Sequence, residues 1–388
     1  MKELSVTDLL GRAPVKLDLE CVRRRVSGRT VLVTGAAGSI GSELCRQLAA
    51  FEPRRLVALD QAESDLFRLE GELQQKYPDL DLAPEIADIR DARRIECVIE
   101  QHAVDSIFHA AAYKHVPLME RHVFEAVENN VFGTYNVAIA AARHNIDGFV
   151  LISSDKAVRS TNVMGATKRV GELLLQSMQN GGTQYVMVRF GNVLGSSGSV
   201  IPIFKKQIAA GGPVTVTHPE MRRYFMTIPE ACQLVLQAAA IAEGGQVCVL
   251  DMGQPVKIVD LARNLILLSG LKPDEDIRIE YSGIRPGEKL YEELSTLLED
   301  TMPTDHSKVR IYTGNGLPHE DLESWLNTLR EVCRSRDVGR LIIALKETVP
   351  DYNPSADLLR KLISPLARGR APVSQVFVSA AGPQERRG

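Results

Sequence analysis

Short apolar segments alternate with longer amphipathic segments through the first part of this chain. Strands of about five residues are predicted at Thr30–Thr34, Arg55–Leu59, Asp79–Ile86, Ser106–His109 and Gly148–Ile152. Apolar spacing predicts helices at Ile40–Phe51, Ser64–Tyr77, Ala92–His102 and Glu125–His144, and later at His319–Ser335 and Val338–Glu347. This alternation is typical of a parallel sheet with helices on both faces. We therefore predict an α/β fold with a Rossmann-like, doubly wound parallel sheet.

The pattern changes near position 190, where glycine and proline become denser. We interpret residues 29–190 as the sheet domain and residues 191–350 as a smaller C-terminal substrate-binding lobe, parts of which return to the first domain. Loops and short elements are expected to build this lobe. Residues 1–28 are expected to form an irregular polar arm. The tail, 351–388, is expected to be partly disordered, because its end from 366 is rich in Gly, Pro and Arg.

Composition excludes several classes of protein. The chain has 388 residues, and its 46 Lys and Arg nearly balance 49 Asp and Glu, which argues against bulk binding to nucleic acid or to an anionic membrane. No apolar run approaches the ~18–20 residues of a membrane span, and the first residues lack the apolar core of a signal peptide. The six cysteines are scattered, so we expect reduced thiols, no metal site and a cytoplasmic location.

A glycine-rich turn joins the first predicted strand to the first helix. Gly35, Gly38 and Gly41 have the spacing G-x-x-G-x-x-G. Glycine allows a pyrophosphate to approach backbone N–H groups, here those of Ser39 and Ile40, and the helix N-terminus adds partial positive charge. The alternative is an ordinary strand–helix turn.

The second predicted strand runs into Asp60, about 20 residues beyond the glycine turn. A carboxylate there can accept hydrogen bonds from the hydroxyls of an adenosine ribose and repels a 2′-phosphate, so the pair predicts NAD in preference to NADP. Asp88 and Ile89, after the third strand, are candidate adenine contacts, although a surface turn explains them equally well. Ala110, after the fourth strand, is a further candidate cofactor contact.

Five further motifs resemble one branch of the extended short-chain dehydrogenase/reductase superfamily. They are His109-Ala-Ala-Ala-Tyr-Lys-His-Val-Pro117, Asn129-Asn-Val-Phe-Gly-Thr-Tyr-Asn136, Ser153-Ser-Asp-Lys-Ala157, Arg189-Phe-Gly-Asn-Val193 and Arg285-Pro-Gly-Glu-Lys289. The resemblance runs from about residue 10 to 350 and is to the nucleotide-sugar 4,6-dehydratases of polysaccharide biosynthesis that act on UDP-N-acetylglucosamine. It implies bound NAD as cofactor and UDP-N-acetylglucosamine as substrate.

The sequence departs from the superfamily at one catalytic position. The superfamily uses a Tyr-x-x-x-Lys pair to remove a hydroxyl proton, whereas this chain has Met164 followed by Lys168, and none of its nine tyrosines precedes a lysine at that spacing. A thioether cannot transfer a proton. The chain is therefore either inactive or uses another group, and it resembles a membrane-associated branch with methionine here that retains the configuration at C5.

The motif after the fifth strand supplies the other candidate catalytic residues. We assign Asp155 as the acid for the departing C6 hydroxyl and Lys156 as the base at C5, with its pKa lowered by nearby Lys168. Ser154 is expected to hydrogen-bond the C4 oxygen, and Lys168 to contact the nicotinamide ribose. The proton of the C4 hydroxyl goes to Asp155 through water, or to His115. A salt-bridged turn is the alternative reading of Asp-Lys.

A UDP-sugar carries two phosphates, so cationic and amide side chains should converge on it. The candidate substrate contacts are Asn192, Arg223 and Arg285 for the phosphates, Glu288 for the uridine ribose, and Lys114 and His115 on the cofactor side.

The predicted reaction is NAD-dependent: C4 is oxidised, water leaves C5–C6, and hydride returns to C6. The open alternatives are a C4-epimerase, an inverting dehydratase and an inert NAD-binding protein. We also expect a homo-oligomer, in which Glu125–His144 either forms a dimer helix or packs in the core. If the chain is cut from a longer protein, the location becomes the cytoplasmic face of a membrane.

Overall fold

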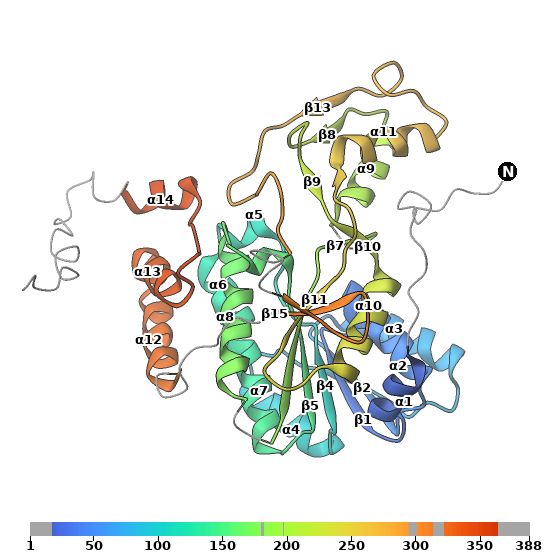
Figure 1. The fold of residues 1–388 in the computed structure, drawn as a ribbon, viewed down its shortest axis with the longest axis vertical. Helices are drawn as coiled ribbons and strands as arrows, with labels where there is room; N and C mark the ends of the chain where they lie inside the picture. The colour runs from blue at the N-terminus through green and yellow to red at the C-terminus, as the bar shows by residue number, and fades with distance from the viewer. Residues whose placement is uncertain (1–17, 180–181, 197, 295–300, 313–321, 364–388) are drawn as a thin grey trace, which may run out of the picture.

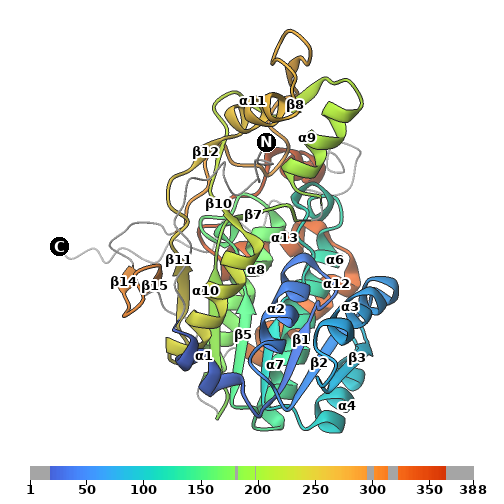
Figure 2. The ribbon, with the colours of Figure 1, turned by 90° about the vertical axis from the view of Figure 1, so that its right-hand side faces the viewer.

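The computed structural model of the chain describes residues 18–179, 182–196, 198–294, 301–312 and 322–363. A nine-stranded sheet with helices on both faces carries a smaller lobe beyond the carboxyl ends of its parallel strands, as Figures 1 and 2 show. The tail predicted to be disordered, from 366 onward, lies outside the described residues. None of the helices in the described ranges has the length and apolar character needed to cross a membrane.

The sheet is parallel through seven of its strands and ends in an antiparallel pair. Its order is β14-β15-β11-β6-β5-β4-β1-β2-β3, and β15 runs antiparallel to both of its neighbours. The strands are β1 (Thr30–Thr34), β2 (Arg55–Asp60), β3 (Leu82–Ile86), β4 (Ser106–His109), β5 (Gly148–Ile152), β6 (Gln184–Arg189), β11 (Val247–Leu250), β14 (Thr301–Pro303) and β15 (Val309–Tyr312). The predicted α/β class and parallel sheet are confirmed.

The two faces of the sheet have separate cores because successive strand residues point to opposite sides. Val31 and Val33 pack with one set of helices and Leu32 packs with the other. The first set is α1 (Leu19–Val26), α2 (Ser39–Ala49), α3 (Glu63–Lys76) and α10 (Ile228–Ile241). The second set is α4 (Ala92–His102), α7 (Thr134–Arg143) and α8 (Val163–Ser177).

A third core attaches the C-terminal helices to the outer side of α8. It joins α5 (Val116–Met119), α6 (Val123–Val127), α12 (Leu322–Ser335), α13 (Val338–Thr348) and α14 (Ala356–Ile363). The two late helices predicted from the sequence are therefore present, although the start predicted for the first, at His319, lies outside the described residues.

The smaller lobe has a core of its own. Its elements are β7 (Asn192–Leu194), α9 (Val200–Ala209), β8 (Val214–Val216), β9 (Arg222–Arg223), β10 (Phe225–Thr227), β12 (Val256–Lys257), α11 (Ile258–Leu268) and β13 (Ile279–Tyr281). Three two-stranded ladders, β10-β7, β12-β9 and β13-β8, connect these short strands.

Three sequence predictions need correction. The arm is not irregular throughout, because Leu19–Val26 form a helix whose first turn is capped by Asp18. The helix predicted at Glu125–His144 contains a π-helical segment, Glu128–Gly133, between α6 and α7; Gly133 there packs against Ile89. The region after 190 contains helices of 10, 14 and 11 residues in addition to short elements.

A buried ion pair fastens the sheet to α8. The Glu172 carboxylate accepts hydrogen bonds from Arg189 on β6, with Nε to Oε1 at 2.6 Å, and from the Ser153 hydroxyl at 2.6 Å. Both charged side chains are almost completely buried, and the Arg189 guanidinium also stacks 4.7 Å from the Tyr312 ring. Because Ser153 directly follows β5, this pair holds the end of that strand.

Replacing Arg189 by methionine should lower the free energy of unfolding by about 3–5 kcal/mol, because Glu172 would keep its charge in a buried site with fewer partners. Urea denaturation monitored by circular dichroism measures this loss. As a control, Arg68→Met removes an exposed arginine paired with Asp65 on α3, and should cost less than about 1 kcal/mol. Equal losses in the two variants would contradict the assigned role of the pair.

Candidate active site

The glycine turn between β1 and α2 is shaped for close backbone approach. Gly35 has φ +68°, and a Cβ at this position would lie 2.6 Å from the Ala111 nitrogen. A Cβ on Gly41 would lie 2.0 Å from the Gly35 carbonyl oxygen. Helix α2 begins at Ser39, next to Ile40, and its cap is Gly38, which has no side chain to cover the first amides. The turn therefore brings backbone N–H groups to a helix N-terminus that has no side-chain cap.

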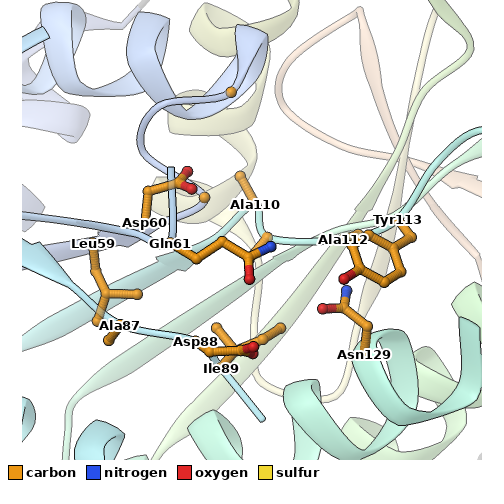
Figure 3. A pocket seen from close by; sticks show the side chains of 13 residues that line it. Leu59, Asp60, Gln61, Ala87, Asp88, Ile89, Ala110, Ala112, Tyr113 and Asn129 are labelled. Atoms are coloured by element: carbon orange, nitrogen blue, oxygen red, sulfur yellow. The ribbon is translucent and has the colours of Figure 1, made fainter. Parts of the chain in front are cut away.

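A cavity of about 150 Å³ opens beside this turn at the carboxyl ends of β1, β2, β3 and β4 (Figure 3). Asp60 lies at its edge: Oδ2 accepts from the Ala37 N–H and Oδ1 from the Ala62 N–H, each at 2.9 Å. Because a carboxylate has about four acceptor positions, capacity remains for hydroxyl donors. The cavity is lined by Gly35, Gly38, Leu59, Asp60, Gln61, Ala87, Asp88, Ile89, Ala110, Ala111, Ala112, Tyr113 and Asn129.

Asp88 and Ile89 both line the cavity, as predicted for adenine contacts, but the Asp88 carboxylate is engaged elsewhere. The Arg90 guanidinium donates to both of its oxygens, and this hydrogen bonding lowers the pKa of Asp88. Ile89 is buried, with 4% of its surface exposed, and offers an apolar wall. These residues and Asp60 fit the adenosine end of a dinucleotide such as NAD, and the glycine turn fits its pyrophosphate.

The asparagine motif provides part of the cavity wall that the sequence analysis had not assigned. Asn130 accepts from the Tyr113 N–H at 2.8 Å and donates both to the Tyr113 carbonyl and to the Thr167 hydroxyl, each at 3.0 Å. It thereby ties the loop after β4 to α8. Tyr113 and Asn129 also line the cavity. Both lie in motifs quoted in the sequence analysis, so those motifs could have identified them as candidate site residues.

The predicted catalytic couple lies at the carboxyl end of β5 in a short 3₁₀ turn, Asp155–Ala157. The Asp155 side chain is fully buried. Its Oδ1 accepts from Lys156 Nζ and from the Ser154 hydroxyl, both at 2.9 Å. Its Oδ2 is buried and has no hydrogen-bond partner within the described part of the chain. Lys156 Nζ also donates to Asn192 Oδ1 at 3.2 Å, so Asn192 holds the lysine.

The charge on Lys156 differs from the sequence expectation. Burial lowers its pKa, but the negative charges of Asp155 and Glu292 outweigh this effect, so the pKa of Lys156 is raised above its ordinary value. Lys168, which was expected to lower it, is not among the groups that act on Lys156; the opposing positive charge is Arg223. The resting lysine is therefore an ammonium ion, and the prediction that Lys168 lowers its pKa is wrong.

Met164 and Lys168 stand one helical turn apart near the start of α8 and are buried, with 3% and 8% of their surfaces exposed. Met164 packs in the core shared with α5 and the C-terminal helices. Lys168 Nζ donates to the Ile152 carbonyl at 2.9 Å, and burial lowers the pKa of Lys168 to about 8.

Three of the predicted substrate contacts, Arg223, Glu288 and Arg285, are linked to one another. Arg223 is buried and donates to the carbonyls of Lys289 and Leu290 at 2.8 and 3.2 Å. Its guanidinium lies 3.9 Å from Glu288. Arg285 occupies an exposed turn, where its backbone N–H donates to Glu288 Oε2.

Lys114 and His115 are exposed on the loop after β4. An ideal Cβ on Gly198 would lie 2.6 Å from His115 Cε1, so the glycine-rich loop after β7 packs directly on this ring. Desolvation and the adjacent Lys114 charge lower the pKa of His115, so the imidazole is neutral near pH 7.

Fold and site together define a Rossmann-fold protein of the extended short-chain dehydrogenase/reductase type, with a cavity beside the glycine turn and a buried Asp–Lys couple at the same edge of the sheet. The profile of the polysaccharide biosynthesis protein family matches residues 31–313. The chain belongs to this family, and the resemblance found in its motifs is confirmed.

The names of the similar proteins describe more than one activity. A capsular polysaccharide biosynthesis protein, CapD, of Staphylococcus aureus is 57% identical over 76% of this chain but 49% of its own length. A UDP-glucose 4-epimerase of Rickettsia canadensis is 34% identical, and an inverting UDP-N-acetylglucosamine 4,6-dehydratase of Campylobacter jejuni is 31% identical; each match covers 69% of this chain and 77% of the relative. The chain thus spans about half the length of CapD.

Solved structures agree with the fold. The Pen protein of Bacillus thuringiensis is 34% identical with a TM-score of 0.68, over 76% of this chain and 90% of its own. The dTDP-glucose 4,6-dehydratase DesIV of Streptomyces venezuelae, solved with NAD, is 22% identical with a TM-score of 0.59, over 67% of this chain and 86% of its own. At that identity the second likeness concerns the fold alone.

Gly41→Ala should destabilise the protein and weaken nucleotide binding, because the new methyl group would overlap the Gly35 carbonyl. Thermal unfolding and an equilibrium titration with NAD measure the two effects. The control is Gly71→Ala in α3, where a Cβ meets nothing within 4 Å; it should stabilise the protein by about 0.5–1 kcal/mol. A Gly41→Ala protein with unchanged melting and binding would exclude this view of the turn.

The lowered pKa of Lys168 also predicts a pH dependence of stability. Between about 8 and 10.5 the unfolded chain binds a proton on Lys168 that the folded protein has released, so unfolding becomes less favourable as the pH rises through this window. The unfolding free energy of the wild type minus that of Lys168→Met should therefore increase from pH 8 to pH 10, because only the wild type gains stability from this group as the pH rises. Urea titrations at several pH values test this, and a difference independent of pH would show that burial does not perturb the lysine.

Proposed function

We propose that this chain catalyses the NAD-dependent 4,6-dehydration of UDP-N-acetylglucosamine, giving the UDP-4-keto-6-deoxy sugar with the C5 configuration retained, for the synthesis of surface glycans. The observation that carries the proposal is the buried Asp155–Lys156 couple at the carboxyl end of β5, with one carboxylate oxygen unpartnered in the described structure. Ligands of open α/β sheets bind at this edge.

NAD is supported by the position of Asp60, which can accept from the adenosine ribose, and by the glycine turn at the start of α2, which can take the pyrophosphate. When bound, NAD accepts hydride from C4 of the sugar and returns it to C6. Asp60 favours NAD over NADP because its negative charge repels a 2′-phosphate. Lys168 and Met164 then belong to the wall beside the nicotinamide ribose.

The chain's own side chains move the protons. Oxidation at C4 makes the C5 proton acidic. Lys156, once it has lost its own proton, accepts that proton and returns a proton to the same face of C5 when C6 is reduced. Asp155, once protonated, gives its proton to the C6 hydroxyl, which leaves as water. The 2.9 Å hydrogen bond between Lys156 Nζ and Asp155 Oδ1 offers a direct route by which the lysine proton reaches the carboxylate.

Since position 164 is methionine, the C4 hydroxyl needs another proton acceptor. Asp155 through a water molecule is the first candidate, because its Oδ2 is free of partners in the described structure. In that case Asp155 later gives this proton to O6, and it takes none from Lys156, whose own proton goes to solvent. His115 is the second, since its lowered pKa keeps the ring neutral and able to accept a proton. Ser154, which donates to Asp155, is proposed to exchange this hydrogen bond for one to the C4 oxygen.

A C4-epimerase is the second candidate function, because the Rickettsia relative that bears this name is 34% identical to the chain. An epimerase oxidises and reduces C4 without removing the C5 proton. It would therefore need no acid–base couple at Asp155 and Lys156.

We also propose that the protein forms a homo-oligomer. The buried face of α7 does not argue for it, because packing against α4 and α8 within one chain accounts for that face.

The deciding experiment is incubation of the protein with UDP-N-acetylglucosamine in deuterated water, followed by NMR. We expect deuterium at C5 and a new C6 methyl group, with couplings that report the retained configuration. Asp155→Asn should lower formation of the methyl group by at least about 100-fold, because the acid is lost. Asp260→Asn removes the same charge from the exposed face of α11 and should leave the rate unchanged.

The other outcomes identify the alternatives. Unlabelled C4 epimers, formed equally well by Asp155→Asn, would replace the dehydratase with an epimerase. Inversion at C5 would contradict the retaining assignment. Tight NAD binding without turnover of any UDP-hexose would leave an inert nucleotide-binding protein.

A further inference from the structure

A second buried carboxylate, Glu292, lies in a segment that the sequence analysis did not assign, and this segment is hydrogen-bonded to the turn after the catalytic couple through Lys289 and the Val158 carbonyl. The Glu292 side chain is 3% exposed, and it lies in the loop between β13 and β14. Oε1 is 3.6 Å from the Arg223 guanidinium, while Oε2 is buried with no hydrogen-bond partner in the described residues. A carboxylate oxygen buried without a partner costs free energy, so its retention calls for an explanation.

The loop that carries Glu292 is fastened in place independently of this carboxylate. The Arg223 guanidinium donates to the carbonyls of Lys289 and Leu290, and Lys289 Nζ donates to the Val158 carbonyl at 3.0 Å. The last contact joins the loop to the turn that follows Lys156. These hydrogen bonds use backbone carbonyls, so they would hold the loop even with an uncharged side chain at position 292.

Lys156 and Glu292 are each surrounded by charged groups of both signs. The groups that act on Lys156 are the carboxylates of Asp155 and Glu292, which favour its charge, and Arg223, which opposes it. The groups that act on Glu292 are Lys156, Arg223 and Lys289, which favour its charge, and Asp155, which opposes it. Burial acts in the other direction and raises the pKa of Glu292. Removing Glu292 would leave one carboxylate beside the ammonium where the protein has two.

We propose that Glu292 is a positioning residue that holds Lys156 in its ammonium form and so sets the pH at which this lysine can act as a base. Its action is electrostatic, because no direct contact joins it to the lysine. Where Glu292 takes up a proton, Lys156 loses one of its two counter-charges and gives up its own proton more easily. The effect on the pH at which Lys156 acts as a base rests on the proposed function, whereas the effect of Glu292 on the charge of Lys156 does not.

The test reads the lysine directly, in the full chain as purified with its nucleotide. Lysine labelled with ¹³C at Cε reports its protonation by NMR, and Lys156→Arg assigns the signal. In Glu292→Gln the Lys156 midpoint should fall by about one pH unit relative to the wild type, because one nearby negative charge is gone. Glu292→Asp keeps the charge and should titrate near the wild-type value.

The matched control is Glu293→Gln, which makes the same change one residue along. Glu293 is 38% exposed and lies 3.5 Å from Lys289 and from Arg159, so screening by water should leave the Lys156 midpoint in place. If Glu292→Gln and Glu293→Gln leave the midpoint equally unchanged while only the former lowers the melting temperature, Glu292 merely braces the loop and the proposal is overturned.

A second readout separates this proposal from the proposed function. If the chain is the dehydratase, the acidic limb of the kcat profile should move to lower pH in Glu292→Gln by the same amount as the NMR midpoint, with KM for the UDP-sugar changed less than about twofold. A shifted NMR midpoint in a protein without dehydratase activity would uphold the electrostatic role and refute only the function. An unshifted NMR midpoint in an active dehydratase would uphold the proposed function and refute the electrostatic role of Glu292.

Discussion

The site exists because parallel strands end at the same edge of a sheet. Neighbouring strands β2, β1, β4, β5 and β6 are hydrogen-bonded in parallel register, so the residues that follow them come together although they lie far apart in the chain. The carboxylate of Asp60, the glycine turn at Gly35 and the couple at Asp155 reach one edge in this way. The smaller lobe then adds Asn192 and Arg223 from the other side, and Figure 2 shows it standing beyond that edge.

Behind this edge, buried polar contacts hold the catalytic turn from two directions. Glu172 and Arg189 fix the end of β5 through Ser153. The C-terminal segment fixes the loop after the couple, where the Asn353 N–H donates to the Ser160 carbonyl at 2.8 Å. The loss of tyrosine at position 164 therefore leaves a rigid framework whose titratable groups are carboxylates, amines and a neutral imidazole. Under the proposed function, proton transfer is shared among these groups.

Much of the fold could be predicted locally. The strands at Ser106–His109 and Gly148–Ile152 were placed at their observed bounds, because each is a short apolar run whose neighbours break the pattern. The π-helical segment Glu128–Gly133 could not be predicted, since its neighbour Ile89, which packs on Gly133, comes from a distant part of the chain. Nor could the helix Leu19–Val26, whose buried face is filled by α10 from more than 200 residues away.

The amino-acid sequence by itself determined the alternating architecture, the glycine turn and the pairing of Asp155 with Lys156, because each is encoded by neighbours within one turn or one strand. Only the tertiary structure decided the charge on Lys156. Asn192 and Glu292 come from segments with no regular spacing, and Lys168 binds the Ile152 carbonyl instead of approaching Lys156. The physical reason is that electrostatic interaction and desolvation act through space, so the residues that set a pKa are selected by folding and not by their distance along the chain.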